Sequence, residues 1–189
     1  MARAHSIILS RDDASSALDA RFSELVSSQR SRALSTAWRM LGGDKAAAED
    51  VVQEAFLRAY RALPKFREDS KIQTWFFTIL IRQISNHRRW KKLKALWPLE
   101  SEESVSDPNP SAQGDHGLRI RITKAVSGLS ERQRSVFVLV HLEEFTVVEA
   151  GQILGCSEGT VKSHLHRALK SLRTELADLK ETSVVMEAS

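Results

Sequence analysis

Apolar residues recur at helical spacing along almost the whole chain, and this pattern constrains the fold more than any other feature of the sequence. Sustained alternation of apolar and polar residues, which is typical of half-buried strands, is hard to find. Glycine and proline interrupt the helical pattern at few places, one of them the run Leu41-Gly42-Gly43-Asp44. The sequence therefore predicts an all-α protein.

A polar segment divides the helical pattern into two parts. Residues 97–117 are rich in Ser, Pro, Gly and acids and poor in apolar residues, which is typical of a flexible linker. We therefore expect two small helical domains, at residues 22–96 and 118–180, joined by an acidic linker at 97–117. The segments 1–21 and 181–189 are expected to be loose.

The first domain is expected to contain a long helix that Asp44 caps and that ends before Pro64, because the residue preceding a proline disfavours helix. Val52, Phe56 and Ala59 share the face of this helix that we expect to be buried. The opposite face either docks a partner or is simply solvated, and local chemistry leaves both readings open. It carries Asp50, Gln53, Glu54, Leu57, Arg58 and Arg61.

A second long helix is predicted from Ser70, which forms a capping-box pattern with Gln73. Its side with Ile72, Trp75, Phe76 and Ile79 is expected to be buried. Its later part contains no acid and combines basic groups with hydrogen-bonding groups that suit an extruded base. These residues are Arg82, Gln83, Asn86, His87, Arg88, Arg89, Lys91 and Lys92. Trp90 lies among them, and we expect it to pack against protein rather than to stack on a base.

The second domain contains a helix-turn-helix pattern. One amphipathic helix is predicted by the spacing of Leu118, Ile122, Ala125, Val126 and Leu129. Before the next helix, a capping box is predicted from Ser130 and Gln133. Thr146 and Glu149 form a further capping-box pattern, and the helix that they open is expected to stop at Gly155 in a left-handed conformation. Ser157 is expected to cap the helix that follows after this short turn.

The outward face of this last helix has the chemistry of a recognition helix. We expect Lys162, Arg167 and Arg173 to meet phosphates, and Thr160, Ser163 and His166 to read bases. An ordinary helical hairpin with a solvated basic face is the alternative. The full set of candidate DNA contacts on this helix is Thr160, Lys162, Ser163, His166, Arg167, Lys170 and Arg173.

The chain lacks the local patterns of an enzyme or a metal site. No glycine-rich phosphate loop, nucleophile elbow or HExxH pattern is present in the sequence. His164 and His166 are two positions apart, so that a helix points them in different directions. Cys156 is a single cysteine and excludes an internal disulfide. We expect no catalytic residue, no cofactor, no metal and no small-molecule substrate.

Charge and hydropathy indicate the cellular setting. The formal net charge is +4 and the pI is about 9.4, which suits a nucleic-acid partner. The opening residues, MARAHSIILSRDD, have no apolar core long enough for a signal peptide, and the apolar stretch Trp75 to Ile81 is too short to cross a bilayer. These features predict a soluble cytoplasmic protein.

The stretch AEDVVQEAFLRAYRALPKFREDSKIQTWFFTILIRQISNHRR closely resembles the second conserved region of extracytoplasmic-function sigma factors, a group of the sigma-70-type subunits of bacterial RNA polymerase. The stretch GLSERQRSVFVLVHLEEFTVVEAGQILGCSEGTVKSHLHRALKSLR resembles their fourth region. The order, the spacing and the linker also match, and the resemblance spans about residues 22–173. Two motifs in the expected order are more specific than a lone helix-turn-helix.

The resemblance implies a promoter-specificity subunit that is not itself an enzyme. By resemblance, the face with Asp50, Gln53 and Arg58 would contact the β′ clamp helices of core RNA polymerase, and the β flap would be a further contact of the chain. Residues 82–94 would bind and help melt the −10 element, and residues 162–173 would bind the −35 element. Phe76, Phe77 and Arg82 are bulkier or more charged than is usual in the family, so no promoter sequence is implied.

Regulation and the linker also follow from the resemblance. Family members are commonly held inactive by an anti-sigma factor that is frequently membrane-anchored, so we expect such a partner and a chain that it can hold at the inner membrane. The acidic linker either threads along the polymerase channel or acts as a passive tether. A free-standing regulator that binds DNA without polymerase is the competing interpretation, and the segment Asp50 to Arg61 distinguishes the two.

Overall fold

The computed structural model describes residues 11–95 and 116–177, and every regular element in these two ranges is helical. The prediction of an all-α protein is therefore confirmed. The first range contains α1 (Arg11–Met40), α2 (Lys45–Ala62), the short 3-10 helix η1 (Leu63–Lys65) and α3 (Ile72–Ala95). The second contains α4 (His116–Gly128), α5 (Glu131–Phe137), the π-helical turn η2 (Val138–Leu142), α6 (Val147–Leu154) and α7 (Glu158–Glu175).

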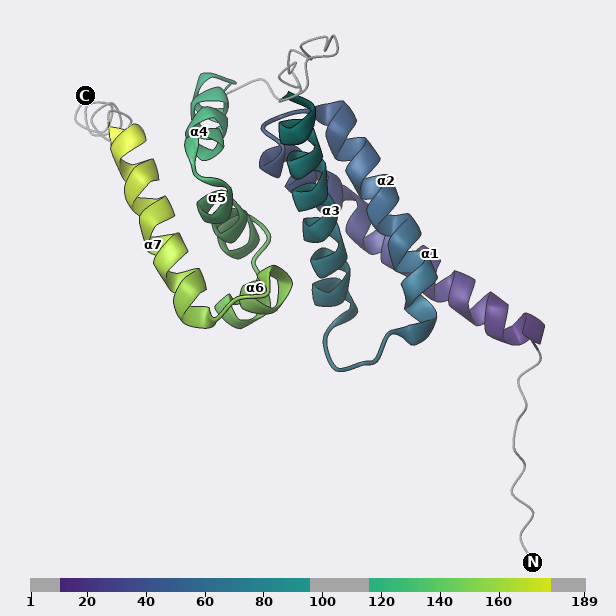
Figure 1. The fold of residues 1–189 in the computed structure, drawn as a ribbon. Helices are drawn as coiled ribbons and strands as arrows, with labels where there is room; N and C mark the ends of the chain where they lie inside the picture. The colour runs from purple at the N-terminus through teal and green to yellow at the C-terminus, as the bar shows by residue number, and fades with distance from the viewer. Residues whose placement is uncertain (1–10, 96–115, 178–189) are drawn as a thin grey trace, which may run out of the picture.

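Helices α1, α2 and α3 pack against one another around an aromatic centre (Figure 1). The rings of Phe56 in α2 and Phe76 in α3 stack with their centroids 4.5 Å apart, and Phe76 is fully buried. The carboxylate of Asp44 accepts a hydrogen bond from the Ala47 amide at 3.0 Å, which confirms the predicted cap of α2. Helix α2 ends at Ala62, just before the turn that contains Pro64.

Helix α1 begins earlier than the sequence indicated. The expectation of a loose segment up to residue 21 is wrong for residues 11–21, which belong to α1. Side chains of the neighbouring elements hold this part of the helix. The Tyr60 hydroxyl donates to Asp19 at 2.9 Å, Arg21 pairs with Glu68 at 3.1 Å, and the Phe22 ring lies edge-on to Tyr60. These partners come from 38 to 47 positions away, so the local pattern did not reveal them.

The start of α3 also differs from the prediction. The Trp75 amide bonds to the Lys71 carbonyl at 3.1 Å, and the helix begins at Ile72 rather than at Ser70. The side-chain amide of Gln73 faces the guanidinium of Arg32 in α1 instead of folding back to cap its own helix. The predicted capping box is therefore replaced by a contact between helices.

Helices α4 to α7 form a second bundle whose connections follow the sequence closely. Both capping boxes, Ser130 with Gln133 and Thr146 with Glu149, are present. Gly155 ends α6 with φ 64°, in the left-handed region that favours glycine. Helix α4 begins at His116, two positions before the expected boundary, and Ile122 is exposed rather than buried.

The two bundles lie side by side in the described structure. Helix α3 packs along α6, and α1 reaches both α4 and α5 (Figure 1). Phe77 of α3 and Phe145, which precedes α6, are both buried with ring centroids 4.9 Å apart. The predicted linker falls almost wholly outside the described residues, as do the segments 1–10 and 178–189.

Candidate functional site

Local sequence chemistry positions the candidate recognition helix α7. The Ser157 hydroxyl accepts from the Thr160 amide at 3.2 Å, and Glu158 lies in the first turn, where the helix dipole favours an acid. Val161, Ala168 and Leu172 are buried against the bundle. A Cβ at Gly151 of α6 would lie 2.8 Å from the Cys156 carbonyl oxygen, so the tight turn between the two helices needs glycine there.

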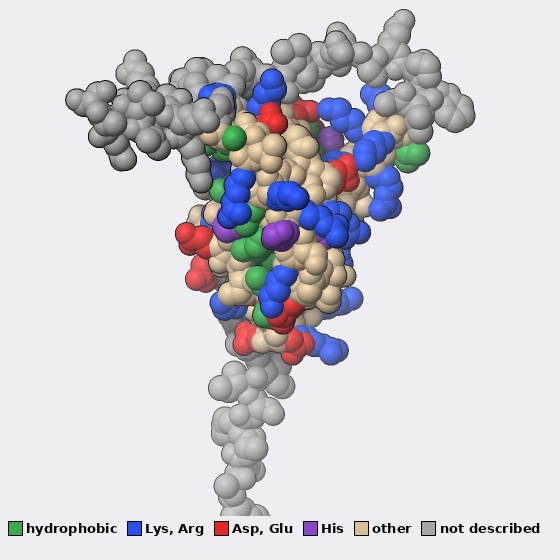
Figure 2. Space-filling model, turned by 90° about the vertical axis from the view of Figure 1, so that its left-hand side faces the viewer, with side chains coloured by type: hydrophobic (Ala, Val, Ile, Leu, Met, Phe, Trp, Pro, Cys, Tyr) green, Lys and Arg blue, Asp and Glu red, His purple; other side chains and the backbone are tan. Residues whose placement is uncertain are grey.

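The opposite face of α7 carries exposed basic and polar side chains. Figure 2 shows a face of the molecule on which lysine, arginine and histidine side chains gather. A shallow hollow on α7 is lined by His166, Lys170, Arg173, Thr174 and Ala177. Thr160 differs from the other candidates, because its hydroxyl is 2.9 Å from that of Ser157 and therefore belongs to the cap. The exposed candidates are Lys162, Ser163, His166, Arg167, Lys170 and Arg173.

The candidate residues of α3 do not form one uniform surface. Gln83 is buried, and His87 and Arg88 are half-buried. Arg88 donates to the carbonyl oxygen of Met40 at the end of α1. Burial, followed by the positive charge of Arg134, lowers the pKa of Arg88. The exposed members of the predicted set are Arg82, Asn86, Arg89, Lys91 and Lys92.

Acidic side chains already hold two of these exposed lysines. Lys91 lies 3.4 Å from Asp44, and Lys92 lies 2.6 Å from Glu131 of α5. The hydrogen bond from Lys92 is the main cause of a lowered pKa of Glu131. Both lysine side chains keep more than two thirds of their surface exposed, at 69% and 72%, so they remain open to an additional anionic partner.

The prediction that Trp90 packs against protein is wrong. Its side chain is 67% exposed, and the Lys94 ammonium lies 5.9 Å from the ring centroid. An exposed indole beside exposed lysines has the composition of a base-stacking platform. Phe76 and Phe77 are bulkier than the residues usual in the family at these positions. Both are fully buried and do not line a surface pocket.

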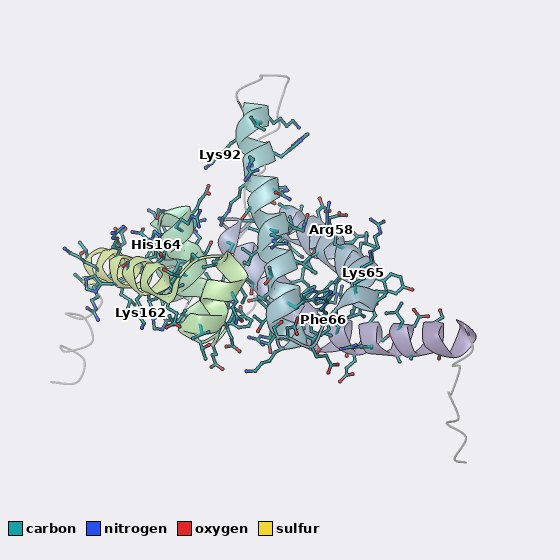
Figure 3. All side chains as sticks on the ribbon, turned by 60° about the horizontal axis from the view of Figure 1, so that its bottom comes forward. Arg58, Lys65, Phe66, Lys92, Lys162 and His164 are labelled. Atoms are coloured by element: carbon teal, nitrogen blue, oxygen red, sulfur yellow. The ribbon has the colours of Figure 1, made fainter. Side chains whose placement is uncertain are left out.

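Helix α2 presents the predicted charged face to solvent. Asp50, Gln53, Leu57, Arg58 and Arg61 are exposed, and Glu54 is half-buried. The Arg58 guanidinium bonds to the Glu54 carboxylate at 2.6 Å. Leu57 keeps 45% of its surface exposed between these charges. Figure 3 shows Arg58 on the opposite side of α3 from Lys162 and His164 of α7.

A basic turn between α2 and α3 is not among the sites predicted from the sequence. Lys65 and Arg67 are exposed there, and Figure 3 shows Lys65 and Phe66 on the same side of α3 as Arg58. The Phe66 ring lies 4.9 Å from that of Trp75, and the Arg21 guanidinium lies 5.3 Å from its centroid. In the sequence, this turn could have been recognised from the run Pro64-Lys65-Phe66-Arg67, which combines a turn residue with alternating basic and aromatic residues.

Two other kinds of feature are absent from the described residues. Within residues 11–95 and 116–177, no group of three or more His, Cys, Asp or Glu side chains could hold a metal ion. In the same ranges, no helix is long and apolar enough to cross a membrane.

Family models match both halves of the chain. Residues 25–93 match the model described as Sigma-70 region 2, which corresponds to α1, α2 and α3. Residues 119–172 match the model described as Sigma-70, region 4, which corresponds to α4 to α7. The exposed face of α2 and the candidate residues of α3 lie in the first match, and those of α7 lie almost wholly in the second.

Curated relatives extend over most of the chain. The chain is 30% identical over 171 residues to the ECF RNA polymerase sigma factor SigW of Bacillus subtilis, covering 84% of this chain and 90% of that protein. It is 31% identical over 155 residues to the RNA polymerase sigma-E factor of Streptomyces coelicolor, covering 82% of this chain and 85% of the relative.

Solved structures share the fold. The sigma factor RpoE from Bartonella quintana, solved in complex with the anti-sigma factor NepR, superposes with a TM-score of 0.71 at 24% identity over 83% of this chain and 97% of that one. CnrH, solved in complex with the cytosolic domain of CnrY, gives 0.62 at 25% identity over 83% and 88%. Because the identity to RpoE is only 24%, this similarity supports the fold alone.

Proposed function

The chain belongs to the extracytoplasmic-function family of sigma-70 factors, and from this membership we propose that it binds core RNA polymerase and directs it to specific promoters. Members of this family are initiation factors and not enzymes. The observation that carries the proposal is the presence of both family regions in one chain, each with an exposed face of the appropriate chemistry. Residues 22–96 would act on core polymerase and the −10 element, and residues 118–180 on the −35 element.

The polymerase contact is assigned to the exposed face of α2. Gln53, Arg58 and Arg61 offer hydrogen bonds and charge around the exposed apolar Leu57. An apolar side chain surrounded by polar groups is the usual composition of a protein interface. The proposed partner is the pair of clamp helices of the β′ subunit, and Asp50 and Glu54 belong to the same contact. The second bundle would lie near the β flap.

Promoter contacts are divided between α3 and α7. On α3 we assign the −10 element to the exposed residues Arg82, Asn86, Arg89, Lys91 and Lys92, with Trp90 as a stacking surface. His87 and Arg88 are less exposed and stand at the margin of this contact, and the burial of Gln83 argues against a base contact there. On α7 we assign the −35 element to the basic outward face from Lys162 to Arg173, inserted in the major groove.

Control by an anti-sigma factor is part of the proposal. RpoE of Bartonella quintana was solved in complex with the anti-sigma factor NepR, and CnrH was solved in complex with the cytosolic domain of CnrY. We propose that this chain works in the cytoplasm and is held inactive by a protein partner of that kind until a signal releases it.

A run-off transcription experiment tests the function. The chain is mixed with bacterial core polymerase and a pool of genomic fragments, and transcripts are mapped and quantified. We expect chain-dependent transcripts with defined start sites. A Gln53→Ala/Arg58→Ala variant should produce fewer of them, because it removes polymerase-facing groups.

Arg30→Ala is the matched control, since Arg30 is an exposed arginine of α1 outside the proposed contact. This variant should transcribe as the wild type does. Absence of both transcripts and a complex with core, together with tight DNA binding by the chain alone, would favour a free-standing regulator instead.

A further inference from the structure

The end of α3 exposes two large apolar side chains. Trp90 keeps 67% of its surface exposed and Leu93 keeps 59%, which are the highest values among the exposed large hydrophobic residues of the described ranges. Because they are three positions apart, they lie about 60° apart around the helix and share one face. Figure 3 shows the turn around Lys92 extending beyond the other helices. The two side chains therefore form a small apolar face on a projecting helix end.

The opposite side of the same turns faces the protein. Arg88 lies about 160° around the helix from Trp90. It is half-buried and donates a hydrogen bond to the carbonyl oxygen of Met40 at the end of α1. Lys92, on the same side as Arg88, pairs with Glu131 of α5 at 2.6 Å. These contacts fix the helix end from one side and leave the apolar face turned outward.

Cationic side chains flank the apolar face in both directions. Lys94 and Lys91 lie about 40° and 100° from Trp90 around one side of the helix. Arg89 and Lys92 lie about 100° and 160° from it around the other side. All four side chains are exposed, and α3 contains no acidic residue. The Lys94 ammonium lies 5.9 Å from the centroid of the Trp90 ring. We call residues 89–94 the α3 tip.

Two of these lysines have acidic neighbours, yet their charge stays available. Lys91 lies 3.4 Å from Asp44 and keeps 69% of its side chain exposed, and Lys92 beside Glu131 keeps 72%. Ion pairs with this much exposure contribute little to stability, so a lysine loses little when it exchanges a carboxylate for a phosphate.

We propose that the α3 tip docks on the surface of an anionic phospholipid bilayer. Trp90 and Leu93 enter the boundary between headgroups and acyl chains, and the flanking cations meet the headgroup phosphates. An apolar face bordered by lysine and arginine, with an indole among them, is the composition of helices that lie in this interface. The helix lies on the bilayer and does not span it, because no helix of the described ranges is long and apolar enough to cross a membrane.

Nucleic acid would use only part of this surface. Phosphates attract the cations, and Trp90 offers its ring to a base. Leu93 has neither a charge nor an aromatic ring, so it gains little from either contact. Only an apolar medium rewards the removal of both side chains from water. The exposure of Leu93 beside Trp90 therefore favours a bilayer as the partner of this face.

A protein partner also fits the α3 tip less well than a bilayer does. A stable protein interface buries about 800 Å² on each partner and is depleted in lysine. The tip instead offers two apolar side chains and three lysines on the convex end of one helix. A bilayer needs no complementary shape. The flexible lysine stems lie along apolar surface while their ammonium groups reach the phosphates.

A bilayer and the promoter would compete for the same residues. Arg89, Trp90, Lys91 and Lys92 belong both to the α3 tip and to the surface assigned to the −10 element. Anionic vesicles should therefore inhibit run-off transcription by the wild type more strongly than by a Leu93→Ser variant. This consequence rests on the proposed function, whereas lipid binding itself does not.

Co-sedimentation with vesicles tests the proposal on the full chain. The vesicles contain equal parts of phosphatidylcholine and phosphatidylglycerol, or phosphatidylcholine alone, at about 0.15 M salt. We expect binding to the anionic vesicles that is roughly tenfold or more tighter than binding to the neutral ones. Leu93→Ser should weaken binding to the anionic vesicles about fivefold. Leu142→Ser is the matched control, since Leu142 is an exposed leucine of the second bundle, and it should bind as the wild type does.

Two further readouts separate insertion from attraction by charge. Vesicles with brominated acyl chains should quench tryptophan emission, and Trp90→Phe should keep most of the binding while it loses part of this quenching. Leu93→Ser should bind a fluorescein-labelled duplex of random sequence as tightly as the wild type, because Leu93 carries no charge. Circular dichroism of each variant establishes that the helices remain folded.

Each outcome decides for or against lipid docking. Equal binding of Leu93→Ser and Leu142→Ser to anionic vesicles would show that charge alone attracts the chain and would overturn the proposal. Absence of binding to anionic vesicles would overturn it as well. An equal loss of vesicle binding and duplex binding in Leu93→Ser would assign the apolar face to nucleic acid instead. The vesicle experiments need neither polymerase nor promoter, so their failure and the failure of the run-off experiment are separate results.

Discussion

The guanidinium of Arg134 in α5 donates a hydrogen bond to the carbonyl oxygen of Met40, the last residue of α1, at 3.2 Å. The same group donates to the carbonyl oxygens of Val126 at 3.1 Å and Leu129 at 3.2 Å, and to that of Ser127. One planar cation thus satisfies carbonyl groups where α1 and α4 end, which otherwise lack partners inside their own helices.

Replacement of Arg134 by alanine should lower the free energy of unfolding by about 2 kcal/mol, because it removes its hydrogen bonds to four carbonyl groups. The carbonyl groups of Met40 and Val126 keep one other donor each, the Arg88 guanidinium and the Leu129 amide. Arg134→Lys should recover only part of this loss, since a single ammonium cannot reach the same set of acceptors. Urea denaturation followed by circular dichroism measures the change. Arg132→Ala, at an exposed neighbouring position, should stay within about 0.5 kcal/mol of the wild type.

Replacement of Gly151 by alanine should destabilise the helix-turn-helix by about 1 to 3 kcal/mol, because the new Cβ would lie 2.8 Å from the Cys156 carbonyl oxygen. Gly128→Ala is the matched control, since a Cβ there meets nothing within 4 Å. That variant should be neutral or slightly more stable. Thermal unfolding compares the two variants, and equal melting temperatures would contradict the proposed close approach.

Replacement of Glu144 by glycine should stabilise the protein by about 1 kcal/mol, because Glu144 has φ 57° and a side chain is strained in that conformation. Glu144→Val should have the opposite effect, since a β-branched residue tolerates positive φ poorly. The free energy of unfolding in urea is the measurement. A Glu144→Gly variant less stable than the wild type would show that the side chain contributes more than the strain costs.

Acid should weaken the capping box that opens α6. The Thr146 amide, followed by the Lys71 ammonium, holds the pKa of Glu149 below its ordinary value of 4.5. A carboxylate with a lowered folded-state pKa adds stability that is present above the unfolded value and is lost as pH falls through the folded value. The free energy of unfolding should therefore decrease from about pH 5 downward, and less steeply in Glu149→Gln. Identical slopes in the two proteins would exclude Glu149 as a contributor.

Substitutions on α7 should divide into two kinds. Lys170→Ala should weaken binding to all duplexes alike and reduce the salt-dependence slope by about 0.9, as expected for one lost phosphate contact. Ser163→Ala and His166→Ala should instead change which base is preferred in the −35 element. Holoenzyme binding to a panel of single-base variants measures both effects. If neither Ser163→Ala nor His166→Ala altered the preference, the base-reading assignment would fail.

Local patterns predicted the parts of the fold that depend on local chemistry. The boxes Ser130 with Gln133 and Thr146 with Glu149 span three positions each, so spacing alone identified them. The exposed faces of α2 and α7 followed from helical periodicity in the same way. Arg32 and Glu143 are 111 positions apart, and no pattern in either segment indicates that they meet.

The predictions that were wrong at the candidate sites depend on contacts between distant segments rather than on local patterns. The buried position of Gln83 and the exposed position of Trp90 depend on which neighbours cover the later turns of α3, and periodicity within one helix does not specify them. The spacing between Ser70 and Gln73 fits a capping box, yet Gln73 meets Arg32 of another helix instead. Tertiary contacts decided each of these positions.

The outward face of α7 is exposed although the two bundles pack against each other. Lys92 of α3 pairs with Glu131 of α5 and still keeps 72% of its side chain exposed, so a DNA phosphate that approaches Lys92 competes with a carboxylate and not with a covered surface.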